Sequence, residues 1–202
     1  MLHEMLDKYS IETLASWKAD GRSYESVVET LELEGGWMLP LERRDWLVTE
    51  YAWAITDPVA IDYLVGLSPV YEVGAGSGYW AHRITEAGGH IIGFDPQEWK
   101  LEAAKIGIKT CKDWYPIFTD APDIPLNATL FLCWPSFDEA WAHEALKAYK
   151  GKNVVYIGEP EGGCCADRAF HQRLMNEWRV VTEIEIPRFE AIRDTFTHYR
   201  RR

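Results

Sequence analysis

Three features are scarce in this chain of 202 residues, and each scarcity argues against a class of protein. The four cysteines (Cys111, Cys133, Cys164 and Cys165) form no C-x-x-C pair, so we expect no metal site of the zinc-finger type. No apolar run approaches the length that crosses a bilayer, so we expect no membrane span. Lys and Arg number 21 against 32 Asp and Glu, a net charge of −11, which argues against nucleic acid as a partner.

Targeting and repeat signals are also missing. The first residues, Met1-Leu2-His3-Glu4, lack the basic-then-apolar pattern of a signal peptide, and together with the unpaired cysteines this favours a cytoplasmic protein. No internal repeat or low-complexity segment is present. A chain of this length, with 47% hydrophobic residues, is expected to fold as one domain over residues 1–202.

The most informative segment that is present is a glycine-rich turn. A β-prone run over residues 70–73 leads into Gly74, Gly76 and Gly78, and a helix-compatible segment follows. Glycines adopt dihedrals that are closed to other residues and leave room for a ligand to touch the backbone. The start of the next helix offers free N–H groups. This pattern predicts a site for a nucleoside-bearing ligand.

Two acidic residues narrow the choice of ligand. The dinucleotide fingerprint G-x-G-x-x-G requires a third glycine where Tyr79 stands, and Gly78 comes one residue early. Glu72 lies two residues before Gly74, where a carboxylate opposes a pyrophosphate but favours the ammonium of an amino acid. Asp95 ends a second buried strand, about twenty residues after the first glycine, and an acid there accepts ribose hydroxyls.

The run acid-x-G-x-G-x-G resembles the first motif of class I S-adenosylmethionine-dependent methyltransferases. Residues 51–55, 72–81, 132–135 and 156–159 are also similar to methyltransferase-like proteins without an assigned substrate. The resemblance implies that S-adenosylmethionine is the cofactor. It further implies that Gly74, Ala75, Gly76 and Gly78 receive the methionine part, with Glu72 favouring the ammonium and Asp95 holding the ribose.

Strand and helix signals alternate from residue 67 onward. We expect strands over residues 70–73, 90–95, 106–111, 129–133, 153–158, 179–186 and 194–199, and helices over residues 78–87, 98–105, 138–149 and 167–177. The expected fold is α/β, a doubly wound, mostly parallel seven-stranded sheet of the Rossmann-like methyltransferase type. It has an antiparallel hairpin at its C-terminal end, a helical N-terminal extension over residues 1–66 and a cofactor-binding core over residues 67–202.

Ligands in such sheets bind beyond the carboxyl ends of the strands, and several further candidates are expected there. Asp113 either accepts from the adenine amine or caps a turn, with Trp80 or Trp114 against the ring. Cys133, at the end of the fourth strand, is assigned to the cofactor site. Trp134 either walls a planar substrate or packs in the core. In the resembled family, enzymes that methylate amines carry Asn or Asp where Cys133 stands, which puts base methylation in doubt.

A glycine-rich loop after the fifth strand supplies the last candidates. Glu159 is the candidate catalytic residue and Glu161 the candidate substrate contact, as an acid/base pair over the substrate. The other interpretation is a surface loop leading into a helix. Spacing here follows no known metal-ligand pattern, so no metal is expected.

The function expected from these features is S-adenosylmethionine-dependent methyl transfer to a small molecule or a protein side chain. Oligomer formation through the N-terminal helices is a further expectation. Two alternatives stay open. One is a catalytically silent module that binds S-adenosylmethionine and regulates a partner. The other is a nicotinamide-dependent oxidoreductase, which Glu72 and Tyr79 oppose.

Overall fold

A computed structural model describes residues 20–33, 41–98, 100, 105, 113–120 and 122–202 of the chain. Of the helical extension expected over residues 1–66, residues 1–19 and 34–40 lie outside the described residues. So do the expected strand over residues 106–111, with Cys111, and most of the helix expected over residues 98–105.

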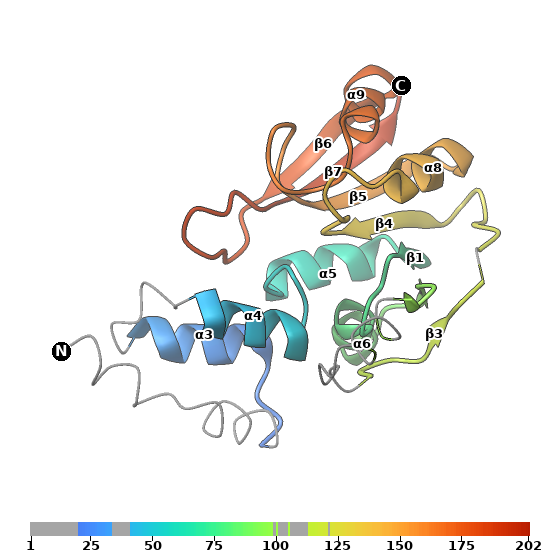
Figure 1. Cartoon of the computed structure of the whole chain (residues 1–202). Helices are drawn as coiled ribbons and strands as arrows, with labels where there is room; N and C mark the ends of the chain where they lie inside the picture. The colour runs from blue at the N-terminus through green and yellow to red at the C-terminus, as the bar shows by residue number, and fades with distance from the viewer. Residues whose placement is uncertain (1–19, 34–40, 99, 101–104, 106–112, 121) are drawn as a thin grey trace.

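The described residues form one seven-stranded sheet in the order β3-β2-β1-β4-β5-β7-β6 (Figure 1). Neighbouring pairs among β1 to β5 are parallel, and β7 pairs antiparallel with both β5 and β6. The predicted fold class is therefore confirmed, including the hairpin at the C-terminal end. The strands are β1 Val70–Val73, β2 Ile91–Phe94, β3 Ile117–Phe118, β4 Thr129–Cys133, β5 Asn153–Gly158, β6 Trp178–Ile184 and β7 Thr195–Arg201.

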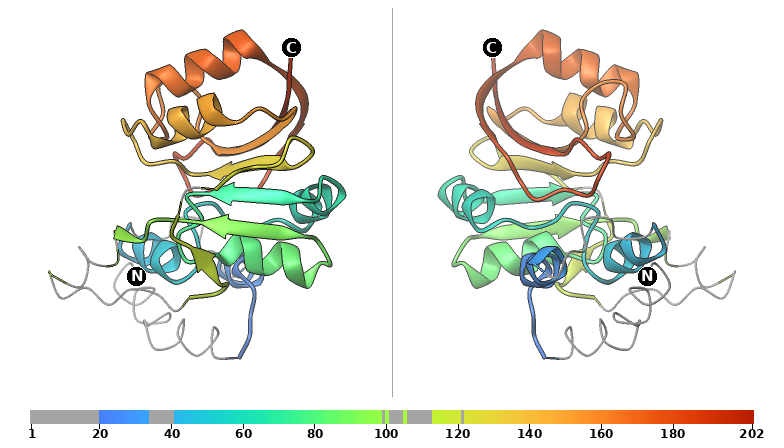
Figure 2. Two further views of the ribbon diagram at one scale, coloured as in Figure 1. Left: turned by 90° about the vertical axis from the view of Figure 1, so that its right-hand side faces the viewer. Right: turned by 90° about the vertical axis from the view of Figure 1, so that its left-hand side faces the viewer.

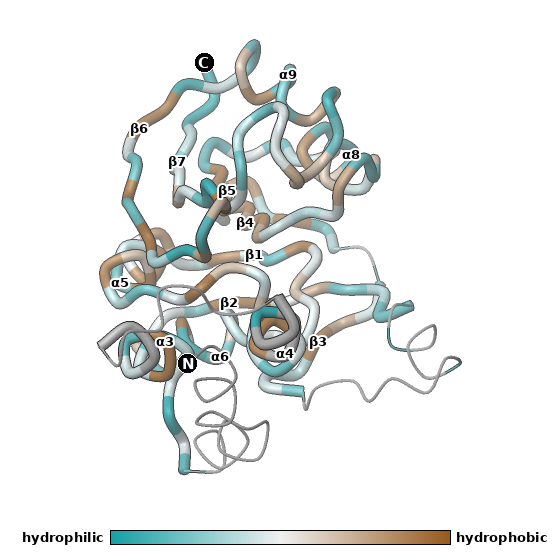
Figure 3. The backbone as a smooth tube through the Cα atoms, turned by 60° about the vertical axis from the view of Figure 1, so that its left-hand side comes forward, coloured by the Kyte–Doolittle hydropathy of each residue, from teal (hydrophilic) through white to brown (hydrophobic). Residues whose placement is uncertain are grey.

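Continuous apolar runs in the central strands place them inside the molecule. Figure 3 shows β2 and β4 as largely hydrophobic, and four of the five residues of β4 are buried. Alternate β4 residues enter different clusters: Phe131 packs with Val70 and Trp80, whereas Leu130 packs with Phe170. The sheet is thus covered on both faces, as a parallel sheet requires.

Helices α5 Pro58–Gly66 and α6 Tyr79–Glu86 contribute to the cluster on one face, and α8 Trp141–Ala148 and α9 Arg168–Glu177 to the cluster on the other. In Figure 2, α8 and α9 (orange) lie toward one end of the row of strands and α6 (green) toward the other. No helix in the described ranges combines the length and apolarity that a bilayer crossing needs.

A third cluster joins the N-terminal helices to the carboxyl edge of the sheet. Helices α3 Tyr24–Leu33 and α4 Leu41–Glu50 pack around Tyr51 and around Tyr79 of α6. Phe189, from the loop between β6 and β7, belongs to the same cluster. Figure 1 shows this loop (dark red) reaching toward α3 and α4. Segments far apart in the sequence therefore meet in this cluster.

The third strand differs from the expected one. It is the two-residue strand β3, which pairs with Gly93 and Phe94 of β2. Asp113 and Trp114 were expected to follow the third strand, but they precede β3 along the chain. A two-residue strand after Pro116 is too short to produce an apolar run that the sequence could reveal.

Asp57 followed by Pro58 in the sequence predicts a helix start, and helix α5 begins there. The Asp57 carboxylate accepts a hydrogen bond from the Ala60 amide at 3.0 Å, and Pro58 occupies the first turn. Asp57→Ala should lower the free energy of unfolding by about 1 kcal/mol, measured by urea denaturation. Asp62→Ala, at an exposed site of the same helix, is the control and should change it by less than about 0.5 kcal/mol. Equal effects of the two substitutions would contradict the assignment of the cap.

Candidate functional site

The glycine loop bends sharply between β1 and α6. Gly74, Gly76 and Gly78 have φ angles of +79°, +56° and +78°, a region that favours glycine. Gly78 is the N-cap of α6 and has no side chain to cap the first amides of that helix. The loop therefore presents bare backbone, followed directly by a helix N-terminus, at the carboxyl edge of the sheet.

Asp95 faces this loop. Its Oδ2 accepts a hydrogen bond from the Gly76 amide at 2.9 Å, and its Oδ1 accepts one from the Gln97 amide at 2.7 Å. The residue is 8% exposed. The parallel pairing of β1 with β2 brings the two strand ends together, so the loop and the carboxylate are neighbours at the carboxyl edge of the sheet.

Glu72 is buried beneath the loop with one oxygen unsatisfied. The residue is 2% exposed, and Oε2 has no hydrogen-bond partner among the described residues. Burial, and next the charge of Asp95, raises the pKa of Glu72 from 4.5 to about 8. A cation placed beside this oxygen would lower the pKa again and stabilise the carboxylate.

A short segment after α4 is tied to the glycine loop by its carbonyl groups. The carbonyl of Tyr51 accepts from Ser77 Oγ at 2.9 Å, and that of Ala54 from Trp80 Nε1 at 3.3 Å. The carbonyl of Glu50 accepts from Trp114 Nε1 at 2.7 Å. The Tyr51 and Trp114 rings stack with their centroids 5.6 Å apart. The segment after α4 therefore packs against the glycine loop.

Several expected site residues are placed elsewhere. Trp80 was expected to border the cofactor, but it is 2% exposed and packs edge-on against Phe131 in the core. Asp113 forms an ion pair with Lys100, and its side chain is 63% exposed. It stays near the loop because the amide of the next residue, Trp114, donates to the Ser77 carbonyl at 2.9 Å. Glu161 is exposed, and its Oε1 lies 3.6 Å from Arg168 Nε.

Glu159, the candidate catalytic residue, is held by the backbone. Its Oε2 accepts from the Cys164 amide at 2.7 Å, and its Oε1 accepts from the Arg193 amide at 3.0 Å. Burial alone raises the pKa of Glu159, but these two hydrogen bonds and the Arg193 charge lower it overall. A carboxylate with both oxygens engaged and a lowered pKa is poorly suited to take a proton. This side chain joins the loop after β5 to the loop between β6 and β7.

A cavity of about 400 Å³ lies next to Trp53 and Trp134. Trp134 lines it and stacks on Trp53 at 5.3 Å between centroids, and the Arg44 guanidinium lies 5.6 Å from the Trp134 ring. The remaining lining residues are Ser136, Phe137, Cys164 and Ile192. The cavity thus combines aromatic walls with one cation.

Cys133 ends β4 and directly precedes Trp134, which lines this cavity. Burial raises the pKa of the Cys133 thiol, and the next largest causes are the charges of Glu72 and Asp194. Cys133 therefore lies near both carboxyl groups, one beneath the glycine loop and one in the loop between β6 and β7. A buried thiol of raised pKa behaves here as a small apolar residue.

The sequence missed two residues of this region. Arg44 lies on α4 within a charged run that gives no sign of contact with three aromatic rings. Asp194 precedes β7, and only the fold shows that it is 2% exposed. Trp53 lies within residues 51–55, one of the segments that carried the family resemblance, so for this residue the sequence did contain a signal.

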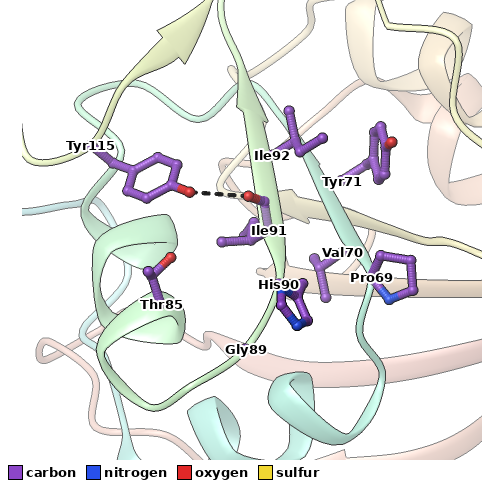
Figure 4. A pocket seen from close by; sticks show the side chains of 9 residues that line it. All are labelled: Pro69, Val70, Tyr71, Thr85, Gly89, His90, Ile91, Ile92 and Tyr115. Carbon is purple, nitrogen blue, oxygen red and sulfur yellow. Dashed lines mark hydrogen bonds between the residues drawn. The ribbon is translucent and has the colours of Figure 1, made fainter.

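Figure 4 shows another cavity, of about 300 Å³, which does not belong to this site. It is lined by Pro69, His90 and the first residues of β1 and β2, at the amino edge of the sheet. Tyr115 crosses it and donates to the Ile91 carbonyl at 3.2 Å. No carboxylate lines this cavity. The described residues contain no group of three or more His, Cys, Asp or Glu side chains that could hold a metal ion.

No protein-family model matches the chain, and no curated protein matches it. Among solved structures, magnesium protoporphyrin IX methyltransferase from Synechocystis PCC 6803 matches at 12% identity and TM-score 0.44, covering 71% of this chain and 77% of that chain. An rRNA methylase from Streptococcus thermophilus matches at 12% identity and TM-score 0.41, covering 73% of this chain and 98% of that chain. A tRNA methyltransferase from Aquifex aeolicus matches at 17% identity and TM-score 0.42, covering 81% of this chain and 76% of that chain.

Similarity at this level concerns the fold alone. It still corrects one expectation, because an rRNA methylase and a tRNA methyltransferase are among the matches. The exclusion of nucleic acid that the net charge suggested is therefore wrong. Net charge sums over the whole surface and does not describe the local field around a site.

Proposed function

We propose that this chain is a class I methyltransferase that uses S-adenosylmethionine and methylates a small molecule or a protein side chain. One observation carries the proposal: the glycine loop, the Asp95 carboxylate and the unsatisfied Glu72 oxygen lie close together at the carboxyl edge of the sheet. A nucleoside joined to an amino acid is the ligand that matches these three features.

The residues present fit this cofactor. Both Asp95 oxygens accept hydrogen bonds from backbone amides, and a carboxylate oxygen can accept more than one hydrogen bond, so this side chain has the chemistry to hold a ribose hydroxyl. A Cβ at Gly76 would meet no atom within 4 Å, so the backbone there is open to a ligand. The Glu72 carboxylate, unpartnered on Oε2, would stabilise the ammonium of the methionine part.

The bound cofactor would supply a methyl group on a positively charged sulfur for transfer to a nucleophile. The chain itself orients the ligand and excludes water. Ser77 is held by the Tyr51 carbonyl, and Trp114 stacks on the Tyr51 ring, so the segment after α4 fixes the loop from above. Positioning and exclusion of water contribute much to in-line displacement reactions.

The same residues bear on the two alternatives. A dinucleotide would place its pyrophosphate beside the loop, where the Glu72 carboxyl opposes it. A silent binding module would bind the cofactor equally well but transfer no methyl group. Radiolabelled cofactor mixed with lysate fractions separates the two functions, since only an enzyme gives a labelled product.

Asp95→Ala tests the cofactor site. We expect S-adenosylhomocysteine to bind the variant about 10- to 100-fold more weakly than the wild type, because a buried, charged hydrogen-bonding partner of the ligand is lost. Calorimetric titration gives both dissociation constants. Asp62→Ala, exposed on α5, is the control and should bind like the wild type. Equal affinities of wild type and Asp95→Ala would remove Asp95 from the site.

A further inference from the structure

Aromatic surface is left uncovered at the cavity of about 400 Å³ that Trp53 and Trp134 line. Trp53 is 49% exposed although its ring stacks on that of Trp134, and Phe137, which also lines the cavity, is 67% exposed. Aromatic rings bury most of their area in a finished core, so exposed rings around a cavity indicate an interaction surface. Flat walls and a volume in the range of small-molecule pockets favour a flat ring as the ligand.

The cavity is lined by a positive charge and by no negative one. Among the described residues that line it, Arg44 alone is charged, and no aspartate, glutamate or histidine is present. The Arg44 guanidinium lies 5.5 Å from the centroid of the Trp53 ring and 5.1 Å from that of Phe189, so aromatic rings hold the charge in place.

Arg44 keeps bonding capacity for a ligand. Its Nε has no hydrogen-bond partner among the described residues, and none of their carboxylates forms an ion pair with it. The Asp194 carboxyl interacts with Arg44 electrostatically, but it is 2% exposed and does not line the cavity. In a chain of net charge −11, a cation without an ion pair at a cavity wall favours an anionic ligand there.

The cavity lies at the same edge of the sheet as the glycine loop. Trp134 directly follows Cys133, the last residue of β4, and β4 pairs parallel with β1, the strand that ends at this loop. Trp53 directly precedes Ala54, whose carbonyl accepts from Trp80 Nε1 at 3.3 Å. A small molecule in this cavity would therefore lie beside the proposed cofactor site.

We propose that this cavity binds a small, flat aromatic carboxylate, with its ring against Trp53 and Trp134 and its carboxylate paired with the Arg44 guanidinium. The planar guanidinium matches the geometry of a carboxylate, which favours this anion over a neutral oxygen. Ser136, another lining residue, supplies a hydroxyl that can donate a further hydrogen bond. The proposal deepens the proposed function, on which its role in methyl transfer rests, by naming the class of small molecule that the chain selects.

Three probes of similar size separate the effect of charge from the effect of flatness. 2-Naphthoate is flat and anionic, 2-naphthamide is flat and neutral, and decahydro-2-naphthoate is anionic with a saturated, non-planar ring system. Calorimetric titration of the full chain at pH 7.5 should show 2-naphthoate binding about tenfold more tightly than 2-naphthamide, because a charged pairing is added. It should bind about fivefold more tightly than the saturated acid, which cannot lie flat against the tryptophans.

Two matched variants test the role of Arg44. Arg44→Gln should abolish the preference for 2-naphthoate over 2-naphthamide, because it removes the cation that distinguishes the two probes. Arg179→Gln, at an exposed site of β6, removes the same charge from the chain and should leave the preference unchanged. Arg44→Lys should keep part of the preference, since lysine retains the charge but loses the planar geometry.

A chemical footprint locates the bound probe without any variant. Cys164 lines the cavity and is exposed, whereas Cys165 is buried, and burial raises the pKa of the Cys133 thiol. Alkylation of Cys164 by iodoacetamide, followed by peptide mass spectrometry, should slow about fivefold when 2-naphthoate occupies most of the protein.

Four results would each overturn the proposal. They are equal affinities of 2-naphthoate and either comparison probe, binding of none of the three, a preference for the anion that survives Arg44→Gln, and alkylation of Cys164 that 2-naphthoate does not slow. Should Arg44→Gln fail to fold, the wild-type affinities and the Cys164 alkylation rates decide alone.

Failure of this proposal is distinguishable from failure of the proposed function. S-adenosylhomocysteine binding reports on the glycine loop and Asp95, whereas the three probes report on the cavity with Arg44. A protein that binds S-adenosylhomocysteine but does not prefer 2-naphthoate keeps its cofactor and loses this ligand class. A protein with the opposite results keeps the binding site for aromatic carboxylates and loses its role in methyl transfer.

Discussion

Glu72→Gln is expected to make the ligand-free protein more stable than the wild type at pH 9, by about 4 kcal/mol. The pKa of Glu72 is about 8 in the fold, against 4.5 for an ordinary glutamate. Between pH 4.5 and pH 8 the Glu72 carboxyl stays protonated in the folded state, whereas it has lost its proton in the unfolded state. The stability of the wild type therefore falls as pH rises from 4.5 to 8 and stays low above 8. Glutamine carries no charge and removes this loss.

Urea denaturation of both proteins at pH 5, 7 and 9 measures the effect as a difference between two pH profiles. The profiles should nearly coincide at pH 5 and separate progressively as pH rises. Glu29→Gln, at an exposed site of α3, is the matched control, and its profile should follow the wild type. Parallel profiles for wild type and Glu72→Gln would show that Glu72 is not held protonated in the fold.

The second large effect is expected at the first glycine of the loop. Gly74→Ala forces a residue with a side chain to φ +79° and pushes its Cβ into the Trp141 ring, where even Cζ2 would lie only 3.0 Å away. Overpacking and left-handed strain together should lower the free energy of unfolding by about 3 kcal/mol. The loop should also move, so we expect S-adenosylhomocysteine binding to weaken by at least about tenfold.

Gly76→Ala separates the effect of backbone strain from the effect of overpacking. Gly76 also has a positive φ, but a Cβ there would meet no atom within 4 Å. This variant should therefore lose only the conformational part, about 1 kcal/mol. Trp141→Leu combined with Gly74→Ala should recover part of the stability, because the smaller side chain relieves the collision. If Gly74→Ala and Gly76→Ala lose the same stability, the contact with Trp141 is not what makes Gly74 necessary.

The central strands were predictable because their local and global signals agree. Strands β1, β4 and β5 have the bounds that the sequence predicted, since each is a short β-prone run ended by a clear change of composition. The cap at Asp57 followed from the sequence for the same reason: Asp before Pro defines a helix start on its own. Features encoded within a few neighbouring residues can be read without the fold.

Features that depend on distant contacts were not predictable. Trp80 lies next to the glycine loop in sequence, but the helix turns its ring into the core. Glu159 sits at a strand end like a catalytic acid, yet the amide that occupies its Oε1 belongs to Arg193, thirty-four residues away. Asp194 has no motif around it, and its burial arises only when the loop between β6 and β7 folds against α3 and α4.

The position of β7 between β5 and β6 has a consequence for synthesis of the protein. Residues 195–201 follow β6 along the chain, yet they provide the hydrogen bonds for one edge of β5 and one edge of β6. Until these residues leave the ribosome, both strands present unpaired backbone groups, a state prone to pair with other chains. A nascent chain stalled before Thr195 is therefore expected to need protection by a chaperone, although most of its parallel sheet has already been made.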